Sequence, residues 1–131
     1  MTNIVKVALE AMDSKKAADI VVLDVAAISS FASYFLICTG DSSRQIQAIA
    51  DEVEARLRQT GVRASHIEGY RHAEWVLMDY LEVVVHIFSR GARKYYDLER
   101  LWRDGKRLDV EKLLEAAPEK VPARRPARRK S

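Results

Sequence analysis

The sequence has one cysteine, three prolines and no long apolar run, and each scarcity excludes a class of protein. A lone Cys38 cannot build an internal disulfide framework or a multi-cysteine zinc site, and the reducing cytosol is the expected compartment. The chain has no run of about 18 apolar residues, so no membrane span is predicted. The first 16 residues lack the apolar block and the small-residue cleavage site of a secretory signal. The 131 residues, 48% of them hydrophobic and 31% charged, predict one compact domain.

Basic charge is concentrated at the C-terminal end of the chain. Residues 1–117 hold 16 basic and 18 acidic side chains, a net charge of −2, whereas residues 118–131 hold six basic and one acidic, a net charge of +5. The acidic body is a poor candidate for a general nucleic-acid binder, which usually has a basic face. All three prolines also lie after residue 117. We therefore expect an ordered domain over 1–117 and a disordered, basic Pro/Arg-rich tail over 118–131.

Hydrophobic periodicity predicts alternating helices and strands in the body. Apolar spacings of three and four predict helices, and runs of β-branched residues predict strands. Helices are expected over 3–16, from Ser43 to Thr60, over 97–103 and after Asp109; strands are expected over 20–25, 34–39, 66–69, 75–78 and 83–88. The run 34–39 is almost continuously apolar, which is typical of a central strand, and the last two strands predict an antiparallel hairpin. Gly91 is expected to open a polar bend. The order predicts an α/β fold with a mixed β-sheet flanked by helices.

The turn Gly40-Asp41-Ser42-Ser43 follows one strand and precedes a helix, a position where free amides could meet a phosphate. Nucleotidyltransferases have a similar turn, but they also need two acidic residues one apart to hold magnesium. No Asp-x-Asp occurs anywhere in the chain. An ordinary capped helix start is the simpler interpretation.

The histidines and the cysteine are weak candidates for chemistry. His66, His72 and His86 lack the close spacing of zinc motifs. His86 shares a strand face with Val84 and Phe88, and we interpret it as a hydrogen-bonded structural residue. Cys38 is expected to behave as a small buried hydrophobe.

The segment Arg93 to Trp102, RKYYDLERLW, is the strongest candidate for a binding surface. It combines three aromatic, three basic and two acidic side chains within ten residues. Such clusters are enriched at binding hot spots. Leu98 and Leu101 are expected to pack inward, while the tyrosines and charged groups face outward.

Several blocks in this chain occur in the same order in a known family. They are Asp19-Ile20 with Leu23-Asp24, Tyr34 to Gly40, Ser42-Ser43-Arg44-Gln45, Glu68-Gly69, Trp75 to Tyr80, Val85 to Phe88, and Tyr95 to Trp102. Over about residues 3–105 the sequence resembles the ribosomal silencing factor family, also called the Iojap family. Ser33 stands where the family commonly has Asp, and Leu81-Glu82 replaces a glycine-containing hairpin turn. The turn geometry is therefore an open question, and the basic tail lies outside the resemblance.

The resemblance implies a degenerate nucleotidyltransferase-like fold without catalytic metal carboxylates, cofactor or enzymatic activity. Members bind the large ribosomal subunit through ribosomal protein L-fourteen and block joining of the small subunit, which represses translation in starvation or stationary phase. The residues expected to contact the partner are Trp75, Asp79, Tyr95, Tyr96, Asp97, Glu99 and Trp102. Self-association as a homodimer through the same face is a further expectation.

Two other interpretations stay open at the level of the sequence. The first is a nucleotidyltransferase-like enzyme that binds a nucleotide phosphate at the Gly40 turn. The second places the main function in the basic tail, as an RNA-binding protein. In the ribosome-binding interpretation, the tail is expected to add a contact with ribosomal RNA. For the ribosome-binding repressor, the cytoplasm is the expected location and no metal site is expected.

Overall fold

A computed structural model describes residues 2–115 of the chain. The elements follow one another as α1 (Thr2–Ser14), β1 (Ala18–Asp24), β2 (Tyr34–Gly40), α2 (Ser43–Gln59), β3 (His66–Glu68), β4 (Trp75–Asp79), β5 (Val83–Ser89), α3 (Arg90–Tyr96), α4 (Leu98–Leu101), β6 (Lys106–Leu108) and α5 (Val110–Glu115). The expected tail over 118–131, and with it the boundary after residue 117, lies outside the described residues.

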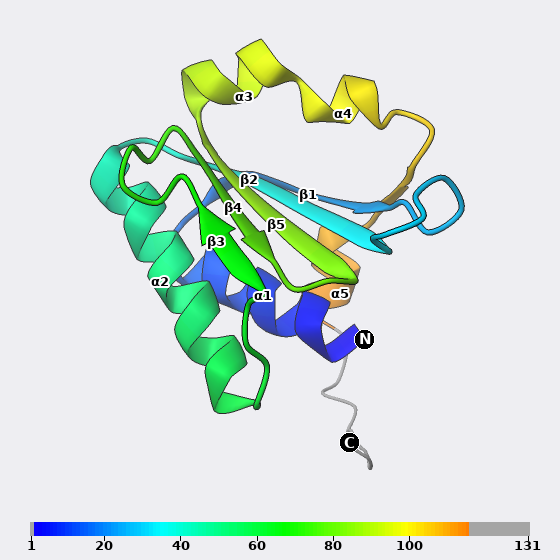
Figure 1. Ribbon diagram of the computed structural model, residues 1–131, viewed down its shortest axis with the longest axis horizontal. Helices are drawn as coiled ribbons and strands as arrows, with labels where there is room; N and C mark the ends of the chain where they lie inside the picture. The colour runs from blue at the N-terminus through cyan, green and yellow to red at the C-terminus, as the bar shows by residue number, and fades with distance from the viewer. Residues whose placement is uncertain (1, 116–131) are drawn as a thin grey trace.

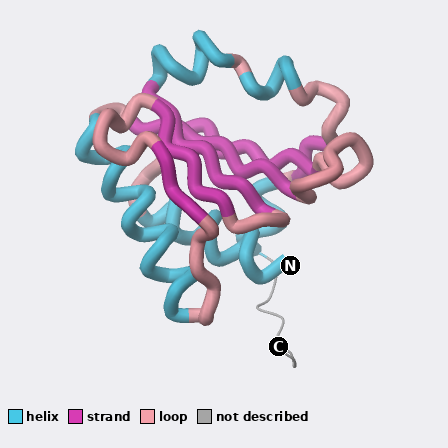
Figure 2. The backbone as a smooth tube through the Cα atoms, in the orientation of Figure 1, coloured by secondary structure: helices cyan, strands magenta, loops and turns pink. Residues whose placement is uncertain are grey.

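The strands form one six-stranded mixed sheet in the order β3-β4-β5-β2-β1-β6. Only β2 and β5 pair in parallel, and every other neighbouring pair is antiparallel. Figure 1 shows α1 and α2 beneath the sheet and the α3–α4 segment above it, and Figure 2 shows the same two layers around the strands. The prediction of a single α/β domain with a mixed sheet flanked by helices is confirmed.

The centre of the sheet's lower face is fully covered. Side chains alternate along each strand, so that Leu36 and Cys38 of β2 and Val85 and Ile87 of β5 point to this face, and all four are buried without any exposed surface. Helices α1 and α2 pack over them, and α5 packs on α1. This layer is the main hydrophobic core.

The upper face has a smaller core under a thinner cover. Phe35 and Ile37 of β2, Phe88 of β5, Ala92 of α3 and Leu98 of α4 form it. Because α3 and α4 have seven and four residues, they cannot cover the whole face. The candidate binding surface described below occupies the remainder.

The block Ser42-Ser43-Arg44-Gln45 forms the N-terminal cap and the first turn of α2. The Ser42 hydroxyl accepts a hydrogen bond from the backbone N–H of Gln45 (3.0 Å), which is an N-terminal cap. The Gln45 side chain accepts from the N–H of Asp41 and donates to the carbonyls of Lys15 and Lys16. The turn therefore fastens the end of α1 to the start of α2, and its side-chain groups serve structure.

Two local predictions were wrong. Residues after Gly91 do not form a bend: α3 begins at Arg90, where the Ser89 hydroxyl caps it by accepting from the N–H of Ala92 (3.1 Å). The helix expected over 97–103 is shorter than predicted: α4 spans Leu98–Leu101, and Asp97, which has a left-handed backbone (φ 47°), separates it from α3. No helix in the described part of the chain is both long and apolar enough to cross a membrane.

Candidate partner-binding site

The upper sheet face presents its side chains in three cross-strand rows. The strand registers place Trp75 beside Phe88 and Thr39, then Leu77 beside His86 and Ile37, and then Asp79 beside Val84 and Phe35. Helix α3 packs on the first row through Ala92 and Tyr96. In the other two rows, the side chains of β4 and β5 are less covered than those of β2. A groove lies over them.

An aromatic cluster occupies the end of the face under α3. The Trp75 ring lies 4.6 Å from the ring of Tyr96 and 5.1 Å from that of Phe88, centroid to centroid. Tyr95 lies edge-on to Tyr96 at 5.0 Å and is 82% exposed, while Tyr96 is 48% exposed. The structure thus brings three of the predicted contact residues, Trp75, Tyr95 and Tyr96, into one cluster with an exposed outer edge.

His86 joins this cluster to the groove. The indole Nε1 of Trp75 donates to Nδ1 of His86 (3.1 Å), so Nδ1 has no proton. Burial lowers the pKa of His86 to about 4, so the ring is neutral at pH 7 and its proton is on Nε2. That atom is buried and has no hydrogen-bond partner within the described region. The expectation of a hydrogen-bonded structural histidine is therefore confirmed for one nitrogen only.

A groove of about 300 Å³ lies over the second and third rows. Its walls are mostly apolar, and two polar side chains, His66 and Asp79, stand at its rim. His86 is the buried polar group in the wall. The apolar and aromatic lining comes from Phe31, Phe35, Leu77, Leu81 and Val84. Phe31 is 67% exposed and Leu81 is 66% exposed. Two large apolar side chains this exposed at one edge are typical of an interaction surface.

The hairpin turn that carries Leu81 closes without glycine. The N–H of Tyr80 donates to the carbonyl of Val83 (2.9 Å), and Leu81 adopts the left-handed region with φ 72°. The Asp79 carboxylate accepts from the N–H of Leu81 (2.8 Å) and so supports this turn. Glu82 contributes its carbonyl to the N–H groups of Ser33 and Tyr34. These bonds hold the Phe31 loop beside the turn and place both exposed side chains together.

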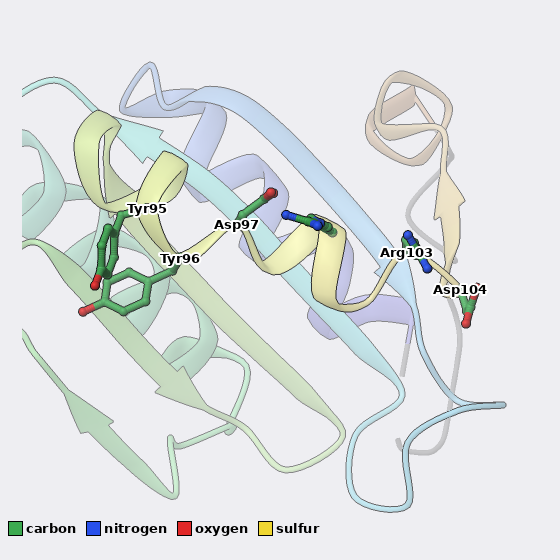
Figure 3. Close-up of a pocket in the computed structure, with 6 residues that line it drawn as sticks. Tyr95, Tyr96, Asp97, Arg103 and Asp104 are labelled. Carbon is green, nitrogen blue, oxygen red and sulfur yellow. The ribbon is translucent and has the colours of Figure 1, made fainter.

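A second hollow runs along the outside of α3 and α4. It is an open trough of about 560 Å³, lined by Tyr95, Tyr96, Asp97, Arg100, Arg103 and Asp104. Figure 3 shows the two tyrosines side by side at one end and Arg103 with Asp104 at the other. The lining charges balance, so the trough has no strong preference for an anion or a cation. Asp97 is exposed here, as expected of a contact residue.

Glu99 has a partner within its own chain. It accepts two hydrogen bonds from the Arg93 guanidinium (3.3 and 2.8 Å) and lies 3.5 Å from Arg107. These hydrogen bonds hold the pKa of Glu99 below its usual range. Arg93 also donates to the hydroxyl of Thr39 and to the carbonyl of Asp19. The pair therefore fastens α3 and α4 to the sheet across the left-handed break at Asp97.

The other predicted residues are spread along the face. Trp102 is half-buried, and its ring stands edge-on to Phe35 at 4.9 Å, where it closes one side of the upper core. Asp79 lies at the far end of β4 from Trp75. Leu98 is buried, as expected; the Leu101 side chain is outside the described set.

The sequence analysis missed Phe31, Leu81 and the groove-facing side of His86. The only local signals were a phenylalanine in a polar loop and a leucine at a turn.

The remaining candidates are structural. Cys38 is buried, and burial raises the pKa of its thiol to about 12, which fits the small hydrophobe that was expected. Among residues 2–115 no three His, Cys, Asp or Glu side chains come together as a metal site. The partly covered sheet face, with its exposed aromatic and apolar groups, is therefore the candidate binding surface of this domain.

Comparison with known proteins identifies the family. A family model described as "Ribosomal silencing factor during starvation" matches residues 1–131. The chain belongs to the ribosomal silencing factor family, and the resemblance seen in its sequence blocks is confirmed.

Similar proteins are found both by sequence and among solved structures. The chain is 45% identical over 109 residues to the ribosomal silencing factor RsfS of Bacillus subtilis, covering 83% of this chain and 92% of that protein. A crystal structure of a Chromobacterium violaceum protein has a TM-score of 0.76 and 40% identity, covering 77% of this chain and 84% of the other. A Bacillus halodurans structure has a TM-score of 0.75 and 39% identity over 83% of this chain and 99% of the other. A mouse protein named for mitochondrial assembly of the large ribosomal subunit is a more distant relative, at 29% identity.

Proposed function

We propose that this protein represses translation by binding the large ribosomal subunit and blocking its association with the small subunit. The contact is made with ribosomal protein L-fourteen through the upper sheet face, in the cytoplasm, under starvation or in stationary phase. Membership of the silencing factor family supports a role at the ribosome. The observation that carries the choice of surface is the groove and aromatic cluster on one partly covered sheet face.

The contact residues divide into two roles under this proposal. Trp75, Tyr95 and Tyr96 supply rigid aromatic area, and Asp79 and Asp97 supply negative charge to a basic ribosomal protein. Glu99 and Trp102 act mainly by holding α3 and α4 over the sheet, because each is engaged by its own chain. A homodimer that uses the same apolar face would compete with the ribosome for it.

Co-sedimentation with separated subunits tests the proposal directly. The full chain should sediment with large subunits and not with small ones, and it should reduce formation of joined ribosomes when added before the small subunit. Order of addition is the control, because a protein that acts by occupying the joining face should have little effect on ribosomes that are already joined. Binding to neither subunit would overturn the proposal.

A further inference from the structure

His86 has one nitrogen satisfied inside the fold and one that is not. Trp75 fixes Nδ1 as an acceptor, which leaves Nε2–H as a donor without an acceptor in the described chain. The ring of Phe35 lies edge-on to His86 at 5.1 Å, and a ring face is at most a weak substitute for an acceptor. A buried donor without a partner is costly, so each one calls for an explanation.

The position of this donor supplies the explanation. His86 is only 4% exposed and lines the groove whose other walls are apolar. Its Nδ1 side is turned toward Trp75, so Nε2 is on the side of the ring that is free of that contact. A ligand group that enters the groove would bring an acceptor to a donor already oriented by a hydrogen bond and by strand pairing, with little loss of side-chain freedom.

The rim of the groove defines the chemistry of the occupant. Phe31 and Leu81 are more than half exposed and offer apolar contact at the mouth. Asp79 lines the groove, and Glu68 lies on the same face of neighbouring β3, with His66 between their carboxylates at 3.8 and 3.2 Å. No Lys or Arg lines this groove among the described residues. An apolar group flanked by a basic one fits such a surface.

We propose that His86 is a specificity-determining residue: its Nε2–H donates to a backbone carbonyl of a protein segment that inserts an apolar side chain between Phe31 and Leu81 and places a basic side chain beside Asp79. The segment belongs to the ribosomal partner, so this inference rests on the proposed function. The side chains over Nε2 separate when the segment enters, and the hydrogen bond selects a segment that presents a carbonyl at that depth.

Two substitutions separate the two nitrogens of His86. His86→Asn keeps an acceptor near the position of Nδ1 for Trp75 but removes the groove donor, whereas His86→Gln places an amide N–H near the position of Nε2. Neither side chain titrates. His72→Asn is the matched control, because His72 is exposed and does not line the groove.

The affinity of the full-length chain for purified ribosomal protein L-fourteen is the measurement. His86→Asn should weaken binding about tenfold, since the partner's carbonyl would be buried without a donor, while His86→Gln should stay within about threefold and His72→Asn should match the wild type. In nitrogen-edited NMR of the wild type, the Nε2–H proton should move downfield on binding. Phe31→Ser should also weaken binding, without loss of thermal stability.

Separate outcomes would contradict the inference and the proposed function. If the wild type binds and both His86 variants bind equally well, or if the Nε2–H resonance does not move, His86 is not a specificity residue and this inference is overturned. If Phe31→Ser abolishes self-association but leaves partner binding intact, the occupant is a second copy of the chain, which also overturns it. If the wild type binds neither the isolated protein nor large subunits, the proposed function itself fails.

Discussion

Acidification should destabilise the protein through His86, and the size of the effect follows from its burial. The pKa of this imidazole is about 4 in the folded chain and 6.5 in its ordinary state. Because the folded-state pKa is the lower one, the unfolded chain binds the proton more tightly, and stability falls as the pH falls below 6.5. Above pH 6.5 both states are neutral at this position and no pH dependence arises from it.

The difference between the two pKa values sets the size of the loss of stability. At pH 4 it corresponds to about 3 kcal/mol of lost stability, and at pH 5 to about 2 kcal/mol. A loss of that size is a large fraction of the 5–15 kcal/mol that typically stabilises a small domain. Glu99 adds a loss of the same sign at lower pH, because its pKa is held below 4.5. Comparison of the wild type with a His86 variant between pH 7.5 and pH 5 therefore isolates this histidine.

Urea unfolding followed by tryptophan fluorescence measures this effect in the wild type, in His86→Gln and in His72→Gln. The wild type and the His72 variant should lose about 2 kcal/mol between pH 7.5 and pH 5 relative to His86→Gln. The Gln side chain also changes the contact with Trp75, but this shifts its stability by a similar amount at every pH. Parallel stability profiles for the wild type and His86→Gln over this range would refute the assigned burial and protonation state.

Four further outcomes are expected. Leu81→Gly should raise the free energy of unfolding by about 1 kcal/mol in urea titrations, because glycine adopts a positive φ without strain, yet it should weaken subunit binding in co-sedimentation. Tyr96→Ala should reduce affinity for the large subunit by about 2 kcal/mol, as a hot-spot aromatic does, while circular dichroism shows an intact fold. Glu99→Gln should lower stability by about 1 kcal/mol by breaking the bidentate pair with Arg93, which thermal unfolding would detect. Removal of residues 118–131 should leave large-subunit binding in place but reduce its dependence on salt, measured as affinity at several salt concentrations; equal salt slopes would show that the tail makes no phosphate contacts.

The core elements of the fold were predictable because their signals are local. Continuous apolar runs marked β2 and β5 as buried strands, and spacings of three and four marked α1 and α2. Helix α3 was missed because RGARKYY has almost no apolar periodicity and contains a glycine, so its start depends on the Ser89 cap. Strand β6 was missed because three mostly exposed residues have no pattern, and only pairing with β1 makes them a strand.

The candidate site was predictable only in part, because its geometry depends on long-range pairing. Aromatic content alone identified Tyr95 and Tyr96 as exposed residues, and the structure confirms their exposure. By contrast, the groove exists because backbone bonds from Ser33 and Tyr34 to Glu82 bring two distant loops together. The unpaired nitrogen of His86 likewise follows from which side chains the register places around it, which no local pattern of residues reveals.

Three features that cost stability coincide around one groove. Leu81 has a left-handed backbone where glycine would be free of strain, Phe31 and Leu81 expose apolar area to water, and His86 has a buried donor without an acceptor. Single costs of these kinds also occur elsewhere among the described residues: Asp19 has φ 50° beside a register shift in β1, and the buried Tyr80 hydroxyl has no hydrogen-bond partner. Scattered single costs are compatible with selection for stability alone, whereas three different costs on the lining of one groove are not expected from it. A single incoming protein segment would cover the exposed area and satisfy the donor together, and we therefore interpret the three costs as preparation of this face for a partner.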